Sequence, residues 1–144
     1  MSSSAALSPV PRNLWLRLFQ VAILAGFIIN MVFIYRAFFN PDAILRPLAL
    51  PPSAANIWLR NTANLMLTIN IFYVPVILNP IRYPAYSWWA ALMRFTGVIF
   101  WLIAMQDNPH FRSYLFADLT LGVIQSALLF LGLRQERKPR IAGF

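Results

Sequence analysis

Four long apolar runs, separated by proline-containing breaks, constrain this chain more than any other feature. The runs lie at about residues 14–39, 57–78, 88–105 and 113–133. A helix needs about 20 predominantly apolar residues to cross the hydrocarbon core of a bilayer. Asparagine followed by proline recurs at 40–41, 79–80 and 108–109, and such a pair ends a helix. The runs predict an all-α, polytopic membrane protein, with residues 1–144 as one integral membrane domain forming an antiparallel bundle of four transmembrane helices.

The composition excludes several classes of protein. The chain is 60% hydrophobic and only 11% charged, whereas soluble domains have about 25% charged residues. It has no cysteine, which rules out disulfides, thiolate chemistry and iron–sulfur clusters. The net charge of +8 comes mostly from single arginines near the ends of apolar runs. That pattern fits control of membrane orientation and contact with anionic lipid, so we expect a bilayer and no nucleic acid as partner.

The positive charges also predict an orientation. Four crossings place both termini on one side of the membrane, and basic residues favour the cytoplasmic side. With the termini inside, eight basic residues lie at or near the inner face and four at the outer face. The inner set is Arg12, Arg17, Arg82, Arg94, Arg134, Arg137, Lys138 and Arg140, and the outer set is Arg36, Arg46, Arg60 and Arg112. The sequence predicts that both termini are cytoplasmic.

Small and polar residues recur at intervals of three and four in each run, which places them on one face of a helix. The stripes are Ile23, Gly26, Asn30, Phe33 and Ala37; Asn61, Asn64, Thr68, Ile71 and Pro75; Ser87, Ala90, Arg94, Gly97, Trp101 and Ala104; and Asp118, Gly122, Gln125, Leu129 and Gly132. Small side chains let membrane helices approach closely, and polar ones bond across helices. We expect these four stripes to face the bundle interior. The proline-rich connection at 40–57 is expected to lie along the membrane surface or to cap the bundle.

Arg94 and Asp118 each place a charge inside an apolar run, which is costly and marks a functional-site hypothesis. An antiparallel alignment of residues 88–105 with 113–133 puts Arg94 level with Ala127. The two charges are then roughly 13 Å apart along the bundle axis, which disfavours an ion pair. The expectation is two polar layers. The outer layer joins Asp118 to Asn30, Asn61 and Asn64. The inner layer joins Arg94 to Gln125, with Asn70 as a further candidate.

These polar residues have two interpretations. Asp118 and Arg94 form a ligand, proton or quinone site, or they are structural, with Arg94 reaching the inner headgroups. The asparagines bond between helices or contact a ligand, and Trp101 packs or stacks on a ligand. The candidate intramembrane site is Asp118, Asn30, Asn61, Asn64, Arg94, Gln125 and Trp101.

No residue pattern predicts a metal, a cofactor or a catalytic group. His110 is the only histidine and lies in a proline turn, where turn chemistry explains it better than metal binding. Glycine-rich phosphate loops and carboxylates at catalytic spacing are missing from the sequence. Whether the chain is an enzyme stays open, with the sequence favouring a non-enzyme.

The positions Arg94, Gly97, Asp118, Gly122 and Gln125 resemble small bacterial inner-membrane proteins of the DoxX-like kind. The resemblance covers the last two runs, roughly a third of the chain. It implies a bacterial inner membrane and a role of the kind often linked to respiratory or redox partners.

Two functions follow as hypotheses. The first is a non-catalytic subunit or accessory protein that packs against a larger membrane complex, possibly a respiratory or redox one, or against copies of itself. The second is a small membrane enzyme or carrier that binds a hydrophobic substrate, such as a quinone or lipid, within the bundle. In the second, Asp118 would act as acid or base and Arg94 would hold an anion or carbonyl.

Overall fold

The computed structural model describes residues 13–51 and 55–137, and within those ranges every regular element is a helix. Its four long helices are α1 (Leu14–Phe39), α3 (Ala55–Leu78), α4 (Pro84–Asp107) and α5 (Arg112–Glu136). Its short elements are α2 (Asp42–Leu45) and the 3-10 helix η1 (Pro109–Phe111). The predicted all-α fold is confirmed, and α2 is a helix that the proline-rich connection had not suggested.

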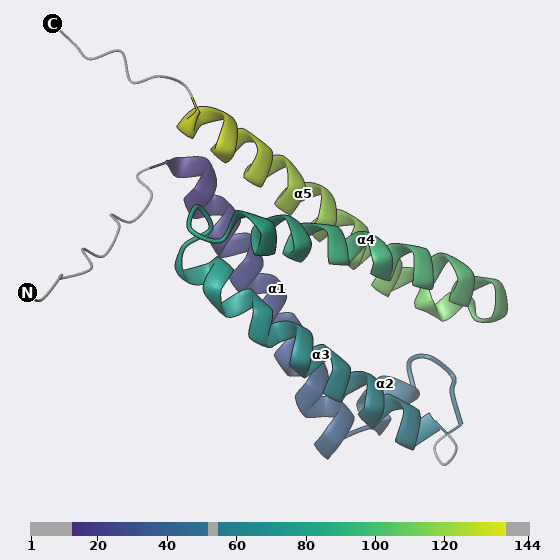
Figure 1. Ribbon diagram of the computed structural model, residues 1–144. Coiled ribbons are helices and arrows are strands. Elements are labelled where there is room, and N and C mark those ends of the chain that lie inside the picture. The colour runs from purple at the N-terminus through teal and green to yellow at the C-terminus, as the bar shows by residue number, and fades with distance from the viewer. Residues whose placement is uncertain (1–12, 52–54, 138–144) are drawn as a thin grey trace, which may run out of the picture.

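The helices form two antiparallel hairpins that diverge from a common end. α1 packs along α3, α4 packs along α5, and α1 and α5 join the two hairpins. The first and last described residues lie together at what we call the inner end, and the hairpins spread apart toward the outer end, where α2 and η1 lie (Figure 1). α3 and α4 touch over a shorter stretch than the helices within each hairpin. The antiparallel bundle is therefore splayed between α3 and α4.

The inner end is held by Asn13, which precedes α1. Its Oδ1 accepts a hydrogen bond from the Trp15 backbone N–H at 3.0 Å, so it caps a helix end that otherwise has unpaired donors. Its Nδ2 donates to the Gly132 carbonyl in the last part of α5 at 2.8 Å. One buried side chain thus starts α1 and attaches it to α5.

Two apolar clusters fill the bundle, one toward each end. The inner cluster is Leu16, Phe19, Ile23, Tyr73, Val76, Ala90 and Leu129. The outer cluster is Ile34, Ala37, Ile44, Leu48 and Ala63. Between them lie the buried polar side chains Asn30, Asn70, Arg94 and Gln125. The two predicted polar layers are therefore wrong: these groups form a single polar region between two apolar ones.

The outer end is capped by the segment around α2. Ala49 adopts a left-handed conformation (φ 51°), which lets the Leu50 N–H reach the Leu45 carbonyl at 3.1 Å and the Ala49 N–H reach Arg46 at 3.0 Å. This is the Schellman arrangement that ends helices. Ile44 and Leu48 pack into the outer cluster. The described part of the connection, residues 40–51, therefore caps the bundle, which is one of the two positions expected for it.

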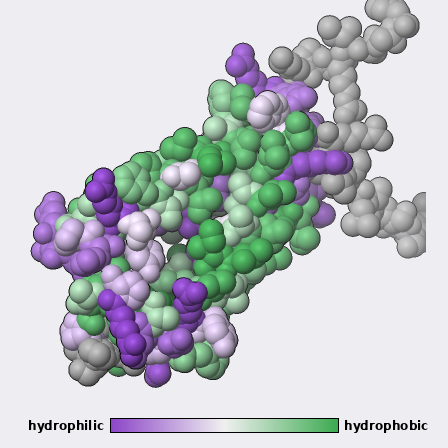
Figure 2. Space-filling view, turned by 180° about the vertical axis from the view of Figure 1, so that it is seen from behind, coloured by the Kyte–Doolittle hydropathy of each residue, from purple (hydrophilic) through white to green (hydrophobic). Residues whose placement is uncertain are grey.

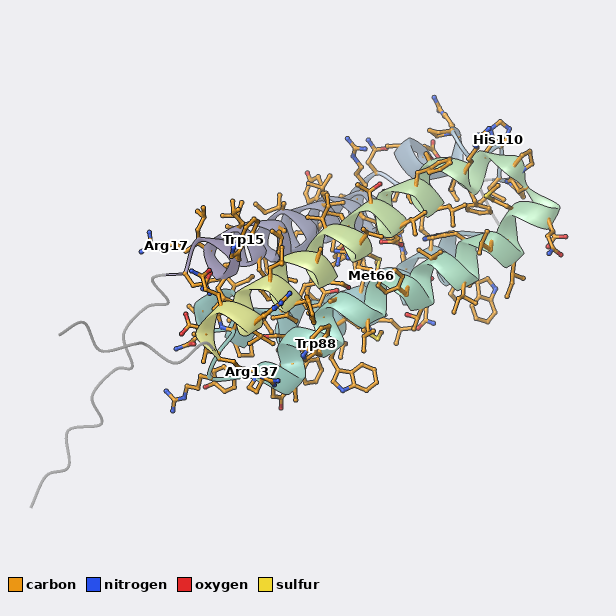
Figure 3. All side chains as sticks on the ribbon, turned by 90° about the horizontal axis from the view of Figure 1, so that it is seen from above. Trp15, Arg17, Met66, Trp88, His110 and Arg137 are labelled. Atoms are coloured by element: carbon orange, nitrogen blue, oxygen red, sulfur yellow. The ribbon has the colours of Figure 1, made fainter. Side chains whose placement is uncertain are left out.

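The outer surface of the bundle is apolar over most of its length. Ile28, Ile99 and Val123 expose 53%, 60% and 53% of their surface, and Figure 2 shows a broad apolar band with hydrophilic groups gathered toward the ends. In Figure 3, Trp15, Arg17, Trp88 and Arg137 lie toward one end and His110 toward the other. In the described part of the chain, four helices are long and apolar enough to cross a membrane. The chain has the features of an integral membrane protein.

The predicted interior stripes are confirmed in three of the four long helices. The stripes of α1, α4 and α5 are buried or half-buried along their length. The stripe assigned to α3 is wrong, because Asn61, Asn64 and Thr68 are exposed there. Thr68 Oγ1 instead donates to the Asn64 carbonyl at 3.1 Å within the helix. The buried face of α3 consists of Ala63, Asn70, Tyr73 and Val76.

Candidate functional site

The centre of the polar region is an ion pair between α4 and α5. Arg94 Nη1 lies 2.9 Å from Asp118 Oδ1, and the two side chains are 8% and 20% exposed. The expectation that these charges occupy separate layers was wrong. A charge-assisted bond of this length between largely buried side chains is one of the stronger polar contacts a protein makes.

The error was in the register of the two helices. A Cβ on Gly122 would lie 3.1 Å from Arg94 Cβ, so Gly122 is the neighbour of Arg94, whereas the predicted alignment placed Ala127 there, five residues further on. Asp118 and Gly122 are four residues apart, or about 6 Å along a helix. The long arginine side chain covers that distance.

Hydrogen bonds extend from the ion pair to all four long helices. Trp101 Nε1 in α4 donates to Asp118 Oδ2 in α5 at 2.8 Å. Arg94 Nη1 lies 3.5 Å from Asn30 Oδ1 in α1. Asn30 Nδ2 donates to Asn70 Oδ1 in α3 at 2.9 Å. We call Arg94, Asp118, Trp101, Asn30 and Asn70 the polar network. It links the two hairpins where they begin to diverge.

Glycines make room for the charged side chains. A Cβ on Gly97 would lie 2.6 Å from Asp118 Oδ2, and a Cβ on Gly26 would lie 2.5 Å from Arg94 Nη2. Contacts that short would force the ion pair to move, because well-packed interiors have little free space. The lack of a side chain at Gly97 and Gly26 therefore leaves the space that the Asp118 carboxylate and the Arg94 guanidinium occupy.

One side of Arg94 is buried and points away from the outer end. Its Nε and Nη2 are inaccessible and have no hydrogen-bond partner in the described residues, and the same holds for Gln125 Oε1 and Ser126 Oγ. Nη2 faces Gly26, with Gln125 Nε2 close by. Gln125 Nε2 itself donates to the Ala22 carbonyl at 3.1 Å. Gln125 therefore ties α5 to α1 behind the ion pair.

A cavity of about 430 Å³ lies on the other side of the ion pair, between the diverging hairpins. Ligand pockets in proteins commonly hold about 300–1,000 Å³. The cavity is lined by Ile29, Asn30, Phe33, Thr62, Met66, Ile69, Tyr73, Met93, Arg94, Thr96, Gly97, Phe100, Trp101, Tyr114, Ala117, Asp118 and Leu121. Most of this lining is apolar, and Arg94 and Asp118 are its charged members. In the space-filling view a hollow lies between the outer parts of the two hairpins (Figure 2).

Aromatic rings and one hydrogen bond close the cavity toward the outer end. The Trp101 ring lies 5.3 Å from that of Phe111 and 5.2 Å from that of Tyr114. Phe111 and Tyr114 also pack against the outer apolar cluster. Asn108 Nδ2 donates to the Leu48 carbonyl at 2.7 Å, which joins the α4–α5 turn to the segment after α2. Exposed residues also line the cavity: Thr62, Thr96 and Phe100 on α3 and α4, and Ile29 and Ala117 on α1 and α5. The cavity therefore opens sideways, through the apolar surface of the bundle.

The structure brings together part of the predicted site. Asp118, Arg94, Asn30 and Trp101 all line the cavity. Asn61 and Asn64 are exposed on α3 and do not line it, and Gln125 is buried behind Arg94.

Sequence reasoning missed the role of the buried face of α3. Tyr73 lines the cavity, is 4% exposed, and its ring centroid lies 6.0 Å from the Arg94 guanidinium carbon. Asn70, considered only as a possible neighbour of Arg94, bonds to Asn30. A regular spacing was available: Ala63, Met66, Asn70 and Tyr73 follow at intervals of three and four. The stripe of Asn61, Asn64 and Thr68 is more polar and so outweighs this spacing in a prediction from sequence, although it faces outward.

His110 lies exposed in η1, where its backbone N–H donates to Asn108 Oδ1 at 3.0 Å. Within residues 13–51 and 55–137, no three histidine, aspartate or glutamate side chains gather as a metal would require.

Comparison of the chain with known protein families, with curated proteins and with solved structures finds no match.

Proposed function

We propose that this chain is an integral membrane protein that binds a hydrophobic molecule, of quinone or lipid type, in the cavity between its two hairpins. The observation that carries the proposal is the combination of an apolar cavity of about 430 Å³ with a polar network at its inner boundary. Pockets that bind small molecules are mostly apolar, with a few placed polar groups that orient the ligand. The sideways opening, which includes the gap between α3 and α4, gives a lipid-soluble molecule direct access.

The proposal assigns a binding role and no chemical step. Both oxygens of Asp118 already accept hydrogen bonds, one from Arg94 and one from Trp101. This arrangement holds the carboxylate in a fixed position beside the cavity, which suits recognition of a ligand.

The accessory-subunit hypothesis remains a prediction. It rests on the large exposed apolar surface, which a lipid bilayer would cover as well as a protein partner would. The cavity is the feature that favours binding of a small molecule over a purely structural role.

We also propose that the inner end faces the cytoplasm. Arg94 lies inside the bundle and does not belong in the count of inner basic residues, so the eight become seven, against four at the outer end. Arg12, Lys138 and Arg140 in that count lie outside the described residues. The excess still supports cytoplasmic termini, and a bacterial inner membrane follows only if the DoxX-like resemblance holds.

Native mass spectrometry after extraction in mild detergent, which keeps a non-covalent ligand bound to the protein, tests the binding function. We expect a hydrophobic molecule to be retained by the wild type and lost from Ala117→Phe, because that ring is added to the cavity wall. Ala127→Phe is the matched control, since Ala127 is exposed on the same helix and does not line the cavity. Equal retention by all three proteins, or by none, would contradict the proposal.

A further inference from the structure

The charges on the cavity wall restrict the kind of molecule that it can hold. Among the residues that line the cavity, Arg94 is the one cation and Asp118 the one anion, and they are paired at 2.9 Å. The wall is therefore neutral overall. A charged ligand would enter this apolar space without a free counter-charge, and an unpaired charge at membrane depth is costly.

The two members of the pair are not equally available to a ligand. The Asp118 side chain is 20% exposed and that of Arg94 only 8%. The Arg94 nitrogens outside the pair, Nε and Nη2, are inaccessible. Nη2 points toward Gly26 and Gln125, neither of which lines the cavity. A ligand in the cavity therefore reaches the carboxylate more easily than the guanidinium.

The carboxylate keeps capacity to accept hydrogen bonds. Oδ1 accepts from Arg94 and Oδ2 from Trp101, and each carboxylate oxygen has a further lone pair. A hydroxyl group on the ligand can donate to that lone pair without adding charge. An anionic headgroup without an O–H, such as a sulfate, cannot donate a hydrogen bond and would be repelled by the carboxylate.

On the basis of the proposed function, we infer that the ligand is an uncharged amphiphile with a hydroxyl group, which donates to Asp118 while its apolar part lies between α3 and α4. The hydroxyl class includes long-chain and isoprenoid alcohols and the reduced, phenolic form of a quinone. Met66 and Met93 on the facing walls suit an apolar chain of irregular shape, because methionine adapts to its neighbours.

Three photoreactive probes with the same long diazirine-bearing chain and different headgroups test the inference. The headgroups are a hydroxyl, a sulfate and a trimethylammonium, which are neutral, negative and positive at all working pH values. Each probe is added to the purified full chain in detergent, and labelling is measured with and without excess unlabelled alcohol of the same chain length. We expect saturable labelling by the alcohol, about tenfold or more above the sulfate and the ammonium, since a penalty of 1.4 kcal/mol is a factor of ten.

Asp118→Asn provides the sharper comparison. It leaves Arg94 as an uncompensated cation on the wall, so the preference for the alcohol over the sulfate should fall by about tenfold or more. Asp107→Asn makes the same chemical change at the end of α4, off the cavity, and should keep the wild-type preference.

The outcomes separate the inference from the proposed function. Equal saturable labelling by all three probes, a preference for either charged probe, or an unchanged preference in Asp118→Asn would overturn the inference while the cavity still binds. Failure of every probe to label saturably would contradict the proposed function as well. The comparison of probes on the wild type decides the point even if the variant does not fold.

Discussion

The Asp118 carboxylate lies directly over Gly97, at a position where a Cβ on residue 97 would stand only 2.6 Å from Oδ2. Trp101, four residues further along α4, donates to the same oxygen. Gly97 and Trp101 thus provide the space and the hydrogen bond that hold the carboxylate at the edge of the cavity. This relationship connects the packing of α4 on α5 to the binding properties proposed for the site.

Gly97→Ala should lower both stability and probe binding. The new methyl group pushes the carboxylate away from Trp101, and such overpacking costs about 1–3 kcal/mol. Gly132→Ala is the control, because its Cβ would make a similarly short contact with Leu16, in the inner cluster away from the cavity. Thermal unfolding in detergent and labelling by the alcohol probe measure the two effects. We expect Gly132→Ala to lose stability and keep its labelling, and equal labelling of both variants would count against the account.

Removal of one member of the ion pair should cost more than removal of both. Arg94→Gln or Asp118→Asn alone leaves a largely buried charge without its partner, which should lower the free energy of unfolding by about 3–5 kcal/mol. The double variant leaves no unpaired charge. The exposed pair Arg46–Asp42, with side chains 82% and 50% exposed, is the control. Its loss should change the free energy of unfolding by less than about 1 kcal/mol. Additive effects at Arg94 and Asp118 would show that the two charges do not interact.

Trp101→Phe should hold the Asp118 carboxylate less firmly, while the aromatic contacts remain. The variant loses the N–H that donates at 2.8 Å, and a hydrogen bond to a charged group is worth about 1.5–3 kcal/mol. Trp89→Phe is the matched control, since Trp89 is 63% exposed on the same helix and does not line the cavity. The melting temperature should fall for Trp101→Phe and stay near wild type for Trp89→Phe. A fall of equal size in both would contradict the assigned role.

Within α3, Asn70 should matter more for stability than Asn61 and Asn64. Asn70→Leu removes the bond to Asn30 across the two helices, and such bonds within a membrane bundle contribute about 0.6–1.7 kcal/mol. Asn61→Leu and Asn64→Leu change exposed positions of the same helix and should leave stability and labelling nearly unchanged. Unfolding measured in the same detergent compares the three. Loss of labelling in Asn61→Leu would contradict this and would place Asn61 in the site.

Labelling of introduced cysteines should establish the orientation. The chain has no cysteine of its own, so each variant carries a single thiol. Arg137→Cys at the inner end and His110→Cys at the outer end (Figure 3) are exposed to water. A membrane-impermeant maleimide applied to intact cells should label His110→Cys and reach Arg137→Cys only after lysis. The reverse pattern would place the termini outside.

The fold followed from the sequence because its determinants are local. The length of each apolar run and the Asn-Pro pairs fix where helices exist, and the stripes on α1, α4 and α5 are buried as their small and polar residues predicted. The site did not follow so directly, because it depends on how the helices align. The shift that brings Gly122 beside Arg94 carries no signal in the spacing of either helix. In α3, polarity was a poor guide, since Asn61, Asn64 and Thr68 face outward while Tyr73 faces inward.

The position at which the alcohol probe cross-links to the chain tests the central claim most directly. The claim is that the polar network adjoins a cavity that opens to lipid between α3 and α4. In membrane-like nanodiscs, peptide mapping should place most saturable adducts within residues 62–73 and 93–101, which hold all of the lining from α3 and α4. These adducts should decrease in Ala117→Phe and persist in Ala127→Phe. The contrary result is a set of adducts spread evenly over the lipid-facing positions of all four long helices and unchanged in Ala117→Phe. It would show that the probe labels only the outer surface, and it would contradict the claim.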